Sequence, residues 1–573
     1  MKLQTLDVTL VALYFMLTLA IGLYHRRRAS LSMESFFITG RRLKWWLAGT
    51  SMVATTFAAD TPLAVTGLVT KNGIAGNWLW WNMALSGMLT VFLFSRLWRR
   101  AGIVTDVEFT EIRYGGKPAA LLRAFRGFYL SVPVNLIIMG WVILAMAKIL
   151  GYLFGVDKLV TVMLCVVFTG IYSTLSGIWG VVITDFLQFI IAMGGTVALA
   201  YFSVDSVGGI HGLRDLLTTR YGDVTGLFSF IPEPDSVWMP LGTFLIYIGM
   251  SWWASWYPGA EPGGGGYIVQ RMLSTTDERE SMLSTLWFNI AHYAIRPWPW
   301  ILTALVALAL YGKGKDPELG YVRLMAEVMP VGFRGLLLVG FLAAFMSTLS
   351  THLNWGSSYL VNDLYRRFLV KNENERHYVL ISRVFTVTLV VLAAIVSMHM
   401  DSVEKAWKFL IAIGAGTGPV YILRWYWWRI NSWSEISAML AAFVVSISLQ
   451  EFWNFSTDAP TEFVLLLVFT TALTTIAWLS VTFLTPPESD ETLSQFWMKI
   501  KPSGTPWGGI KEEKHMMDCN GILKPICMWM VGSFLVYSTL FAFGKFLLGF
   551  PHQGTAMALI AVASGVLLKV LMR

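Results

Sequence analysis

Charged residues are scarce in this chain. Only 14% of its 573 residues are Asp, Glu, Lys or Arg, whereas 55% are hydrophobic and the mean hydropathy is +0.60. Soluble proteins carry about 25% charged residues, so the composition excludes a soluble multidomain protein. The apolar residues fall in runs of roughly 20, the length that crosses a hydrocarbon core about 30 Å thick. The composition therefore predicts an all-α polytopic membrane protein.

Cysteine is also scarce. Cys165, Cys519 and Cys527 show no metal-ligand spacing, so we expect inert thiols and no disulfide framework. There is no cleavable signal pattern, because the first apolar run is long enough to remain as a helix. No Walker pattern for ATP binding is present. The net charge of +8 comes from basic clusters between apolar runs, so we expect no nucleic-acid partner.

About fifteen apolar spans can be delimited, and the loops between them predict topology. Basic clusters follow the first span at Arg26, Arg27 and Arg28 and the ninth at Arg366 and Arg367. Basic loops stay cytoplasmic, which predicts an outside N-terminus and a cytoplasmic C-terminus in a plasma membrane, the inner membrane if the source is bacterial. The expected segments are a first helix with its basic loop at 1–45, a five-helix set at 46–204, an extracellular loop at 205–237, a second five-helix set at 238–429, two helices at 430–485, a cytoplasmic linker at 486–522 and two helices at 523–573.

The second span, at 46–70, is predicted to be interrupted. Ala58-Ala59-Asp60-Thr61-Pro62 sets a carboxylate and a proline near its middle. Proline removes a hydrogen bond from the helix, and Asp at the bilayer centre costs about 2.5–3.5 kcal/mol. We therefore expect Asp60 to face a wet or paired interior. The alternative is a structural kink in which a neighbouring helix holds Asp60.

The seventh span, at 238–269, carries a stronger break. Pro258, Glu261, Pro262 and the four glycines at 263–266 cannot sustain a continuous helix in lipid. The alternative is a loop outside the membrane. Spans 2–6 and 7–11 form two sets of five, and each set begins with an interrupted member. That pattern indicates the binding site of a secondary transporter.

The ninth span, at 331–360, concentrates hydroxyl groups at its midpoint. Ser347, Thr348, Ser350 and Thr351 interrupt an otherwise apolar stretch. These hydroxyls would bond only to their own backbone in an ordinary helix. Sodium is a hard cation that prefers oxygen ligands, so the hydroxyls and the freed carbonyls of the second span also suit a sodium site.

With these motifs, the chain resembles the sodium:solute symporter family over about residues 5 to 485. The resemblance rests on AADTP in the second span, DVEFTEIRYG at 106–115, YSTLSGIWGVVITDFLQ at 172–188, YIVQRMLS at 267–274 and AAFMSTLSTHLNWGSSYLVNDLYRR at 343–367. It implies an inverted five-plus-five helix repeat of the amino acid–polyamine–organocation, or LeuT-like, architecture. The first span would precede the repeats, and the last four would follow them.

The resemblance also implies a sodium site. Its ligands would be the carbonyls of Ala58, Thr61 and Ala344 and the hydroxyls of Ser347 and Thr348. Asp185 matches a carboxylate associated with sodium exit or with a second sodium site, or it is a satisfied residue at a helix end. Asp60 matches an acidic position that some members need for coupling. Because Ala344 stands where members with two sodium sites carry a further hydroxyl, we expect one sodium ion per cycle.

The substrate contacts are expected on the broken spans and the helices around them. Aromatic residues there would stack on a sugar ring or face an ammonium group, or simply pack. Two carboxylates argue against an anionic substrate and favour a sugar, a polyol or a zwitterionic amino acid. The candidates are Asp60, Asn135, Trp256, Tyr257, Glu261, His292 and Thr417.

The sequence thus predicts a sodium-coupled symporter that imports a small polar solute by alternating access. It predicts that the protein is not an enzyme, that its environment is the lipid bilayer, and that it needs no obligatory protein partner. Proton coupling through Asp60, Glu261 or Asp185 is the alternative within this class. A channel, or a membrane-embedded enzyme using His292, is the alternative from other classes.

Overall fold

The computed structural model describes residues 3–29, 33–254, 257, 261–502 and 519–573. Over these residues the fold is helical throughout, and the only strand-like pairing is an isolated bridge between Leu43 and Thr275. This confirms the all-α prediction.

The α-helices are α1 (Thr5–Ala29), α2 (Met33–Ile38), α3 (Trp45–Thr56), α4 (Asp60–Asn72), α5 (Trp78–Trp81), α6 (Ala84–Leu89), α7 (Ser95–Ala101), α8 (Phe109–Arg113), α9 (Gly116–Tyr129), α10 (Asn135–Phe154), α11 (Lys158–Ser206), α12 (Gly209–Tyr221), α13 (Thr225–Phe228), α14 (Leu241–Met250), α15 (Gly266–Ser274), α16 (Glu278–Asn289), α17 (Pro297–Tyr311), α18 (Gly320–Val328), α19 (Phe333–Ser358), α20 (Glu375–Met398), α21 (Val403–Gly414), α22 (Gly418–Leu423), α23 (Ser432–Glu451), α24 (Pro460–Leu484), α25 (Asp490–Ile500), α26 (Cys519–Leu547) and α27 (Pro551–Leu571). Short 3₁₀ or π segments are η1 (Ile74–Asn77), η2 (Thr90–Phe94), η3 (Asp106–Glu108), η4 (Leu130–Val134), η5 (Ser251–Trp253), η6 (Ile290–Ile295), η7 (Pro317–Leu319) and η8 (Tyr359–Leu369).

The number of membrane-crossing helices is lower than expected from the sequence. Ten helical stretches among the described residues are long and apolar enough to cross a membrane, or eleven if α3 and α4 count as one bent span. The expected count of fifteen is therefore not confirmed. Three further apolar helical stretches, 5–21, 158–171 and 241–253, are shorter than a full span.

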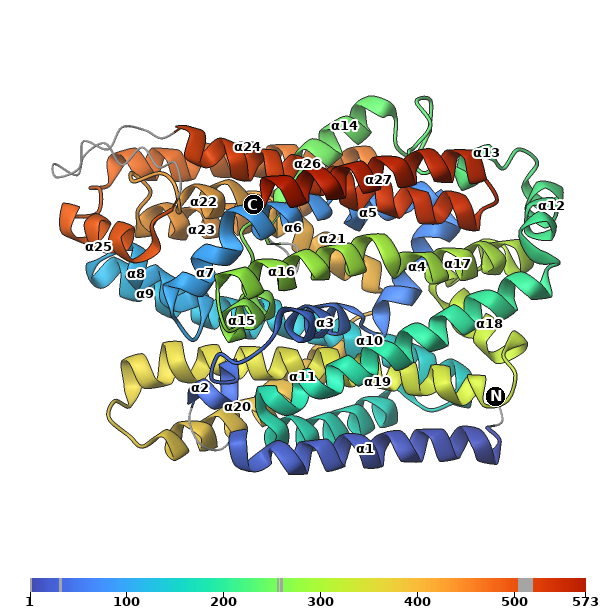
Figure 1. The fold of residues 1–573 in the computed structure, drawn as a ribbon, viewed down its shortest axis with the longest axis horizontal. Helices are drawn as coiled ribbons and strands as arrows, with labels where there is room; N and C mark the ends of the chain where they lie inside the picture. The colour runs from blue at the N-terminus through green and yellow to red at the C-terminus, as the bar shows by residue number, and fades with distance from the viewer. Residues whose placement is uncertain (1–2, 30–32, 255–256, 258–260, 503–518) are drawn as a thin grey trace.

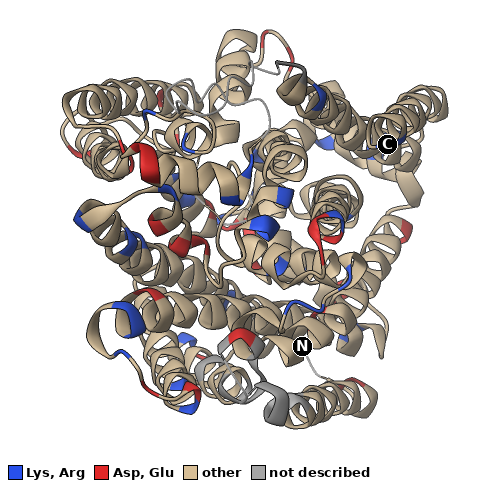
Figure 2. Cartoon of the chain, turned by 60° about the vertical axis from the view of Figure 1, so that its left-hand side comes forward, with Lys and Arg blue, Asp and Glu red and all other residues tan. Residues whose placement is uncertain are grey.

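The helices form one bundle with its long elements roughly aligned (Figure 1). α1 lies along one edge, against α11 and α19, and α26 and α27 lie along the opposite edge. The broken elements α3, α4 and α15 lie in the interior between these edges. Charged residues are sparse along the helices, and some of them belong to segments inside the bundle rather than on its outer rim (Figure 2).

The second predicted span is broken as expected. α3 ends at Thr56, α4 begins at Asp60, and the two helices meet at an angle of 59°. Pro62 falls in the first turn of α4, where its missing N–H has no intrahelical partner to lose. The proline therefore fixes the start of α4.

The seventh predicted span is also divided. α14 ends at Met250 and η5 at Trp253, and the next helix that the structure describes, α15, begins at Gly266. Gly263, Gly264 and Gly266 have φ values of 88°, 84° and 50°. Only glycine adopts such angles freely, so these residues set the path of the chain between the two helices.

Small residues let the interior helices approach closely. Gly49 of α3 faces α16, where an added Cβ would lie 2.5 Å from the Ser284 carbonyl oxygen and 2.9 Å from Trp287 Cδ1. Backbone contact of this kind is typical of helix pairs in membranes, where small side chains allow tight packing.

We predict that Gly49→Ala lowers the thermal unfolding midpoint of the purified protein, because overpacking costs about 1–3 kcal/mol. Gly194→Ala is the matched control, since a Cβ there on α11 would meet nothing within 4 Å. Fluorescence-detected unfolding measures both variants. Equal midpoints for Gly49→Ala and wild type would refute the close contact of α3 with α16.

Candidate functional site

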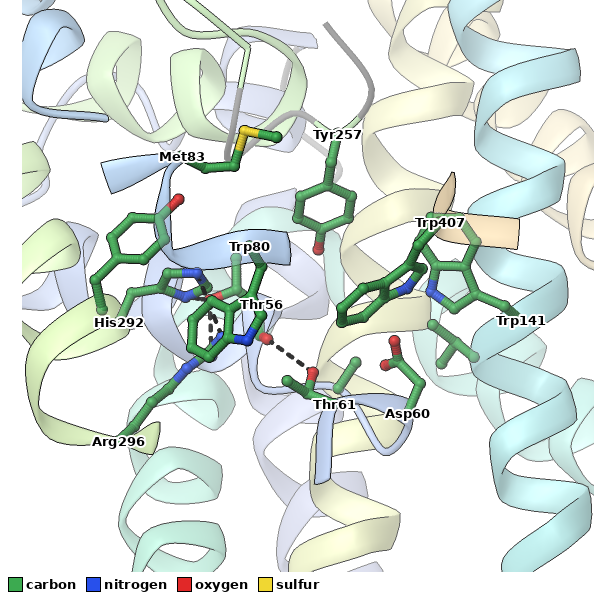
Figure 3. Close-up of a pocket in the computed structure, with 13 residues that line it drawn as sticks. Thr56, Asp60, Thr61, Trp80, Met83, Trp141, Tyr257, His292, Arg296 and Trp407 are labelled. Carbon is green, nitrogen blue, oxygen red and sulfur yellow. Dashed lines mark hydrogen bonds between the residues drawn. The ribbon is translucent and has the colours of Figure 1, made fainter. Parts of the chain in front are cut away.

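A cavity opens at the break between α3 and α4 (Figure 3). Its walls are mostly aromatic, and its polar groups come from the break and from the segment of η6 and α17. The lining residues are Thr56, Ala58, Asp60, Thr61, Trp80, Met83, Trp141, Val142, Tyr257, His292, Tyr293, Arg296 and Trp407.

Asp60 is buried in this cavity, with 2% of its surface exposed. Its Oδ1 accepts no hydrogen bond from the described residues, and none of their basic side chains lies within 4.0 Å of its carboxylate. Trp141 and Trp407 lie beside it in Figure 3. Asp60 stands in the first turn of α4, where the helix dipole favours a negative charge. Within the described ranges, no neighbouring helix therefore holds Asp60 by an ion pair.

Arg296 stabilises the other side of the break. Its Nη1 donates hydrogen bonds to the Val53 carbonyl oxygen at 3.2 Å and to Thr56 Oγ1 at 3.0 Å. His292 Nδ1 lies 2.9 Å from the same Thr56 hydroxyl. A positive charge is favourable at the C-terminal end of α3, where carbonyl groups lack helical partners.

Sequence reasoning placed His292 in the site and missed Arg296 as a site residue. Apart from His292, Arg296 is the only basic or acidic side chain between Ser281 and Gly312. The rule that singled out Asp60, a charge at the middle of an apolar span, applies equally to Arg296.

The hydroxyls of α19 meet the last turn of α3. Thr348 Oγ1 lies 2.7 Å from the Thr55 carbonyl oxygen and 2.9 Å from that of Ala344. Ser347 is turned away from the break and donates to Asp185 Oδ1 at 2.6 Å. Ala58 and Thr61, which follow Thr55 in the chain, line the cavity.

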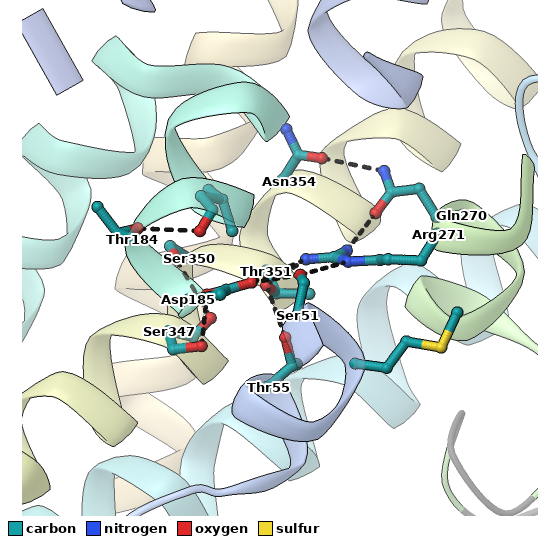
Figure 4. Close-up of polar contacts among 12 residues, drawn as sticks. Ser51, Thr55, Thr184, Asp185, Gln270, Arg271, Ser347, Ser350, Thr351 and Asn354 are labelled. Atoms are coloured by element: carbon teal, nitrogen blue, oxygen red, sulfur yellow. Dashed lines mark hydrogen bonds and ion pairs between the residues drawn. The ribbon is translucent and has the colours of Figure 1, made fainter. Parts of the chain in front are cut away.

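Asp185 is the centre of a buried polar cluster that joins four helices (Figure 4). Besides Ser347, its carboxylate accepts a hydrogen bond from Ser51 of α3 at 2.5 Å and lies 3.5 Å from Arg271 of α15. Arg271 also donates to Thr351 of α19 at 2.9 Å. Asp185 itself belongs to α11, so it contacts both broken elements and the hydroxyl-bearing helix at once.

The remaining predicted substrate residues divide between two places. Asn135 does not line the cavity and instead exchanges hydrogen bonds with His352, at 2.9 Å to its carbonyl and 2.7 Å to its ring. Glu261 and Thr417 line a second cavity. Tyr257 borders both cavities, and Trp256 lies outside the described residues.

Comparison with known proteins identifies the family. The sequence model of the sodium:solute symporter family matches residues 36–442, which is most of the chain. The chain belongs to the sodium:solute symporter family. It is accordingly a transporter of the membrane and not an enzyme.

Several relatives of this symporter are sugar cotransporters. Sodium/glucose cotransporter 4 of Mus musculus is 24% identical over 80% of this chain and 70% of its own. The sodium/glucose cotransporter of Vibrio parahaemolyticus is 23% identical over 78% and 86%, and a sodium/mannose cotransporter of Bos taurus is 24% identical over 78% of each chain.

The fold of this symporter also matches a solved structure. A sodium-coupled sialic acid symporter, in its substrate-bound outward-open state, superimposes with a TM-score of 0.68 at 18% identity. The match covers 85% of this chain and 99% of the other. At that identity the comparison establishes a shared fold.

The symporter also holds a network of buried charges that sequence reasoning missed. Arg126 of α9 pairs with Glu435 of α23 at 3.0 Å and lies 3.6 Å from Glu261. Arg424 pairs with the same Glu435 oxygen at 3.2 Å, and the Tyr114 hydroxyl donates to the other at 2.6 Å. One carboxylate thus compensates two buried guanidinium groups. Glu261 connects this network to the second cavity.

We predict that Glu435→Gln destabilises the protein by about 3–5 kcal/mol, because it leaves buried guanidinium groups without their closest carboxylate. Glu327→Gln is the matched control. It breaks the pair of Glu327 with Arg323, in which both side chains are about half exposed, and should cost less than about 1 kcal/mol. Thermal unfolding of both variants checks this, and equal shifts would contradict a central role for Glu435.

Proposed function

We propose that this protein is a sodium-coupled secondary active symporter that imports a small polar organic solute, a sugar, polyol or amino acid, by alternating access. The observation that carries the proposal is the meeting of three features at one helix break: the carbonyls at the end of α3, the hydroxyls of α19, and a cavity with a buried carboxylate that forms no ion pair with a described side chain. Membership in the sodium:solute symporter family and the names of the sugar-cotransporting relatives support it.

Sodium is one of the two cargoes. Its proposed ligands are the carbonyls of Ala58, Thr61 and Ala344 and the hydroxyls of Ser347 and Thr348. Thr348 supports this assignment because its hydroxyl already bridges α19 to the last turn of α3. All five groups are oxygen donors, as a hard cation requires.

Asp185 is proposed to lie on the sodium path or at a second sodium site. Its link to the first site is Ser347, whose hydroxyl it holds at 2.6 Å. The Ser347 hydroxyl can donate its proton to Asp185 while its oxygen lone pairs ligate a sodium ion, so one hydroxyl would connect the ion to Asp185. Binding of the ion would thereby change the contacts of Asp185 with Ser51 and Arg271, which belong to the two broken elements.

The solute is proposed to bind in the cavity beside the break. Asp60 offers an acceptor, His292 and Arg296 lie opposite, and the ring of Tyr257 closes the cavity on one side. Tyr257 also lines the second cavity, so the two cavities share one side chain.

Alternating access is proposed to follow from two inverted five-helix repeats, 46–204 and 238–429. With the N-terminus outside, the second cavity and the network of Arg126, Glu261 and Glu435 lie on the cytoplasmic side. These ion pairs join α9, α23 and the break before α15. They would have to separate for the solute to leave toward the cytoplasm, which makes them a cytoplasmic gate.

Proton coupling is the competing hypothesis, since Asp60, Glu261 and Asp185 are all buried carboxylates. The two hypotheses differ in one measurement. Uptake into proteoliposomes across a pH gradient in sodium-free buffer should be absent for a sodium-coupled protein. Full uptake under those conditions would establish the proton as the coupling ion.

We predict that Ser347→Ala combined with Thr348→Ala abolishes sodium-driven uptake, because two of the five proposed ligands are removed. The transported solute is first found by a thermal-shift screen of sugars, polyols and amino acids in sodium, since ligands of the folded state raise its stability. Its uptake into proteoliposomes is then measured with an imposed sodium gradient.

Ser358→Ala is the control for this double variant. Ser358 is also a buried hydroxyl of α19, but it donates to the Trp355 carbonyl of its own helix at 2.6 Å. Its loss should leave uptake near the wild-type rate. Undiminished sodium-dependent uptake in the double variant would rule out the assigned site.

A further inference from the structure

The solute cavity contains two buried groups of opposite charge, and neither forms a direct ion pair with a described side chain. Asp60 and Arg296 are 2% and 1% exposed. Within the part of the chain that the structure describes, neither has an oppositely charged side chain within 4.0 Å. Buried charges are normally paired or compensated, so two unpaired ones on a single cavity call for a ligand.

Each of the two groups also has an atom that forms no hydrogen bond with the described residues. Asp60 Oδ1 has no donor, and Arg296 Nε has no acceptor, among the described residues. Arg296 Nη1 is engaged by α3, whereas Nη2 has only a long 3.5 Å contact with His292. Nε and an Nη nitrogen form the edge with which an arginine grips a carboxylate through two parallel hydrogen bonds.

The two charges lie at opposite sides of the cavity, as Figure 3 shows. Arg296 and His292 lie on one side, Asp60 lies on the other, and Thr56, Thr61 and Trp80 lie between them. The side that holds Asp60 is also the side of Trp141 and Trp407. Aromatic faces next to a carboxylate favour a cationic nitrogen.

We propose that the transported solute is a zwitterion, an amino acid or a betaine, whose cationic nitrogen binds Asp60 and whose carboxylate binds Arg296. This inference rests on the proposed function, because it names the solute of that same site. It narrows the class further than the sugar-cotransporting relatives do.

The charges of the other solute classes fit less well. A simple organic cation would pair with Asp60 but would be repelled by Arg296. A simple anion would pair with Arg296 but would be repelled by Asp60. A sugar or polyol would supply hydroxyls to both groups but would leave both charges uncompensated. If Arg296 served only to cap α3, its free edge and the unpaired Asp60 on the same cavity would have no explanation.

Ligand-induced thermal stabilisation of the full-length protein in sodium chloride tests this proposal. The probes are the twenty standard amino acids and glycine betaine as zwitterions, and glucose, galactose, mannitol, choline and propionate as the other classes. We expect stabilisation by at least one zwitterion and none by the others. The best amino acid is then compared with its methyl ester, which lacks the carboxylate charge, and its N-acetyl form, which lacks the ammonium group.

Each derivative should bind roughly 10- to 100-fold more weakly, as expected when one partner of a charged hydrogen bond is lost. Two variants sharpen the assignment. Arg296→Gln should bind the methyl ester as well as the parent amino acid, and Asp60→Asn should bind the N-acetyl form as well as the parent. Glu327→Gln, at an exposed position, should preserve the wild-type preference.

The proposal is overturned if no zwitterion stabilises the protein, if a sugar or a singly charged probe does so instead, or if both derivatives bind as tightly as the parent. The derivative comparison uses wild-type protein and holds even if a variant misfolds. Repeating the screen in potassium chloride separates this claim from the proposed function. Equal zwitterion binding in both salts would refute sodium coupling and support the zwitterion as the solute class. Sodium-dependent binding of a sugar would support sodium coupling and refute the zwitterion.

Discussion

The structure depends on the interruption of a helix inside an apolar bundle. Backbone groups freed at such a break cost several kcal/mol each unless they find partners, because hydrocarbon offers none. The Thr55 carbonyl in the last turn of α3 accepts a hydrogen bond from Thr348 of α19, and the Thr56 hydroxyl contacts Arg296 and His292. These contacts tie α19 and the segment of η6 and α17 to this one helix end, beside the cavity.

The same constraint supports the proposed coupling of sodium and solute. Thr348 contacts α3 directly, and the adjacent Ser347 contacts Asp185, which in turn lies beside Arg271 of the second broken element. An ion that orders the end of α3 would change the contacts of both hydroxyls at once. A ligand shifts a conformational equilibrium only through such differential contacts, and this cluster provides a physical route between the ion and the solute cavity.

The polar residues and the proline that are unusual inside an apolar span could be predicted from the sequence as parts of the site. Asp60 and Pro62 in mid-span and the hydroxyls of Ser347 and Thr348 stand out locally. In the structure Asp60 lines the cavity at the break and Thr348 contacts the end of α3, whereas Ser347 contacts Asp185. Pairings could not be predicted, because Arg126 and Glu435 are 309 residues apart and each has an ordinary sequence context. Asn135 was predicted to contact the solute but is hydrogen-bonded to His352. This pairing depends on the tertiary packing and could not be predicted from the sequence.

Sodium is proposed to bind where α19 meets the end of α3. Binding of radioactive sodium to the purified, monodisperse protein tests this site without knowledge of the solute. Wild type should show saturable binding that potassium does not displace, and this binding should be lost when Ser347→Ala and Thr348→Val are combined. Wild-type sodium binding in that double variant would contradict the claim.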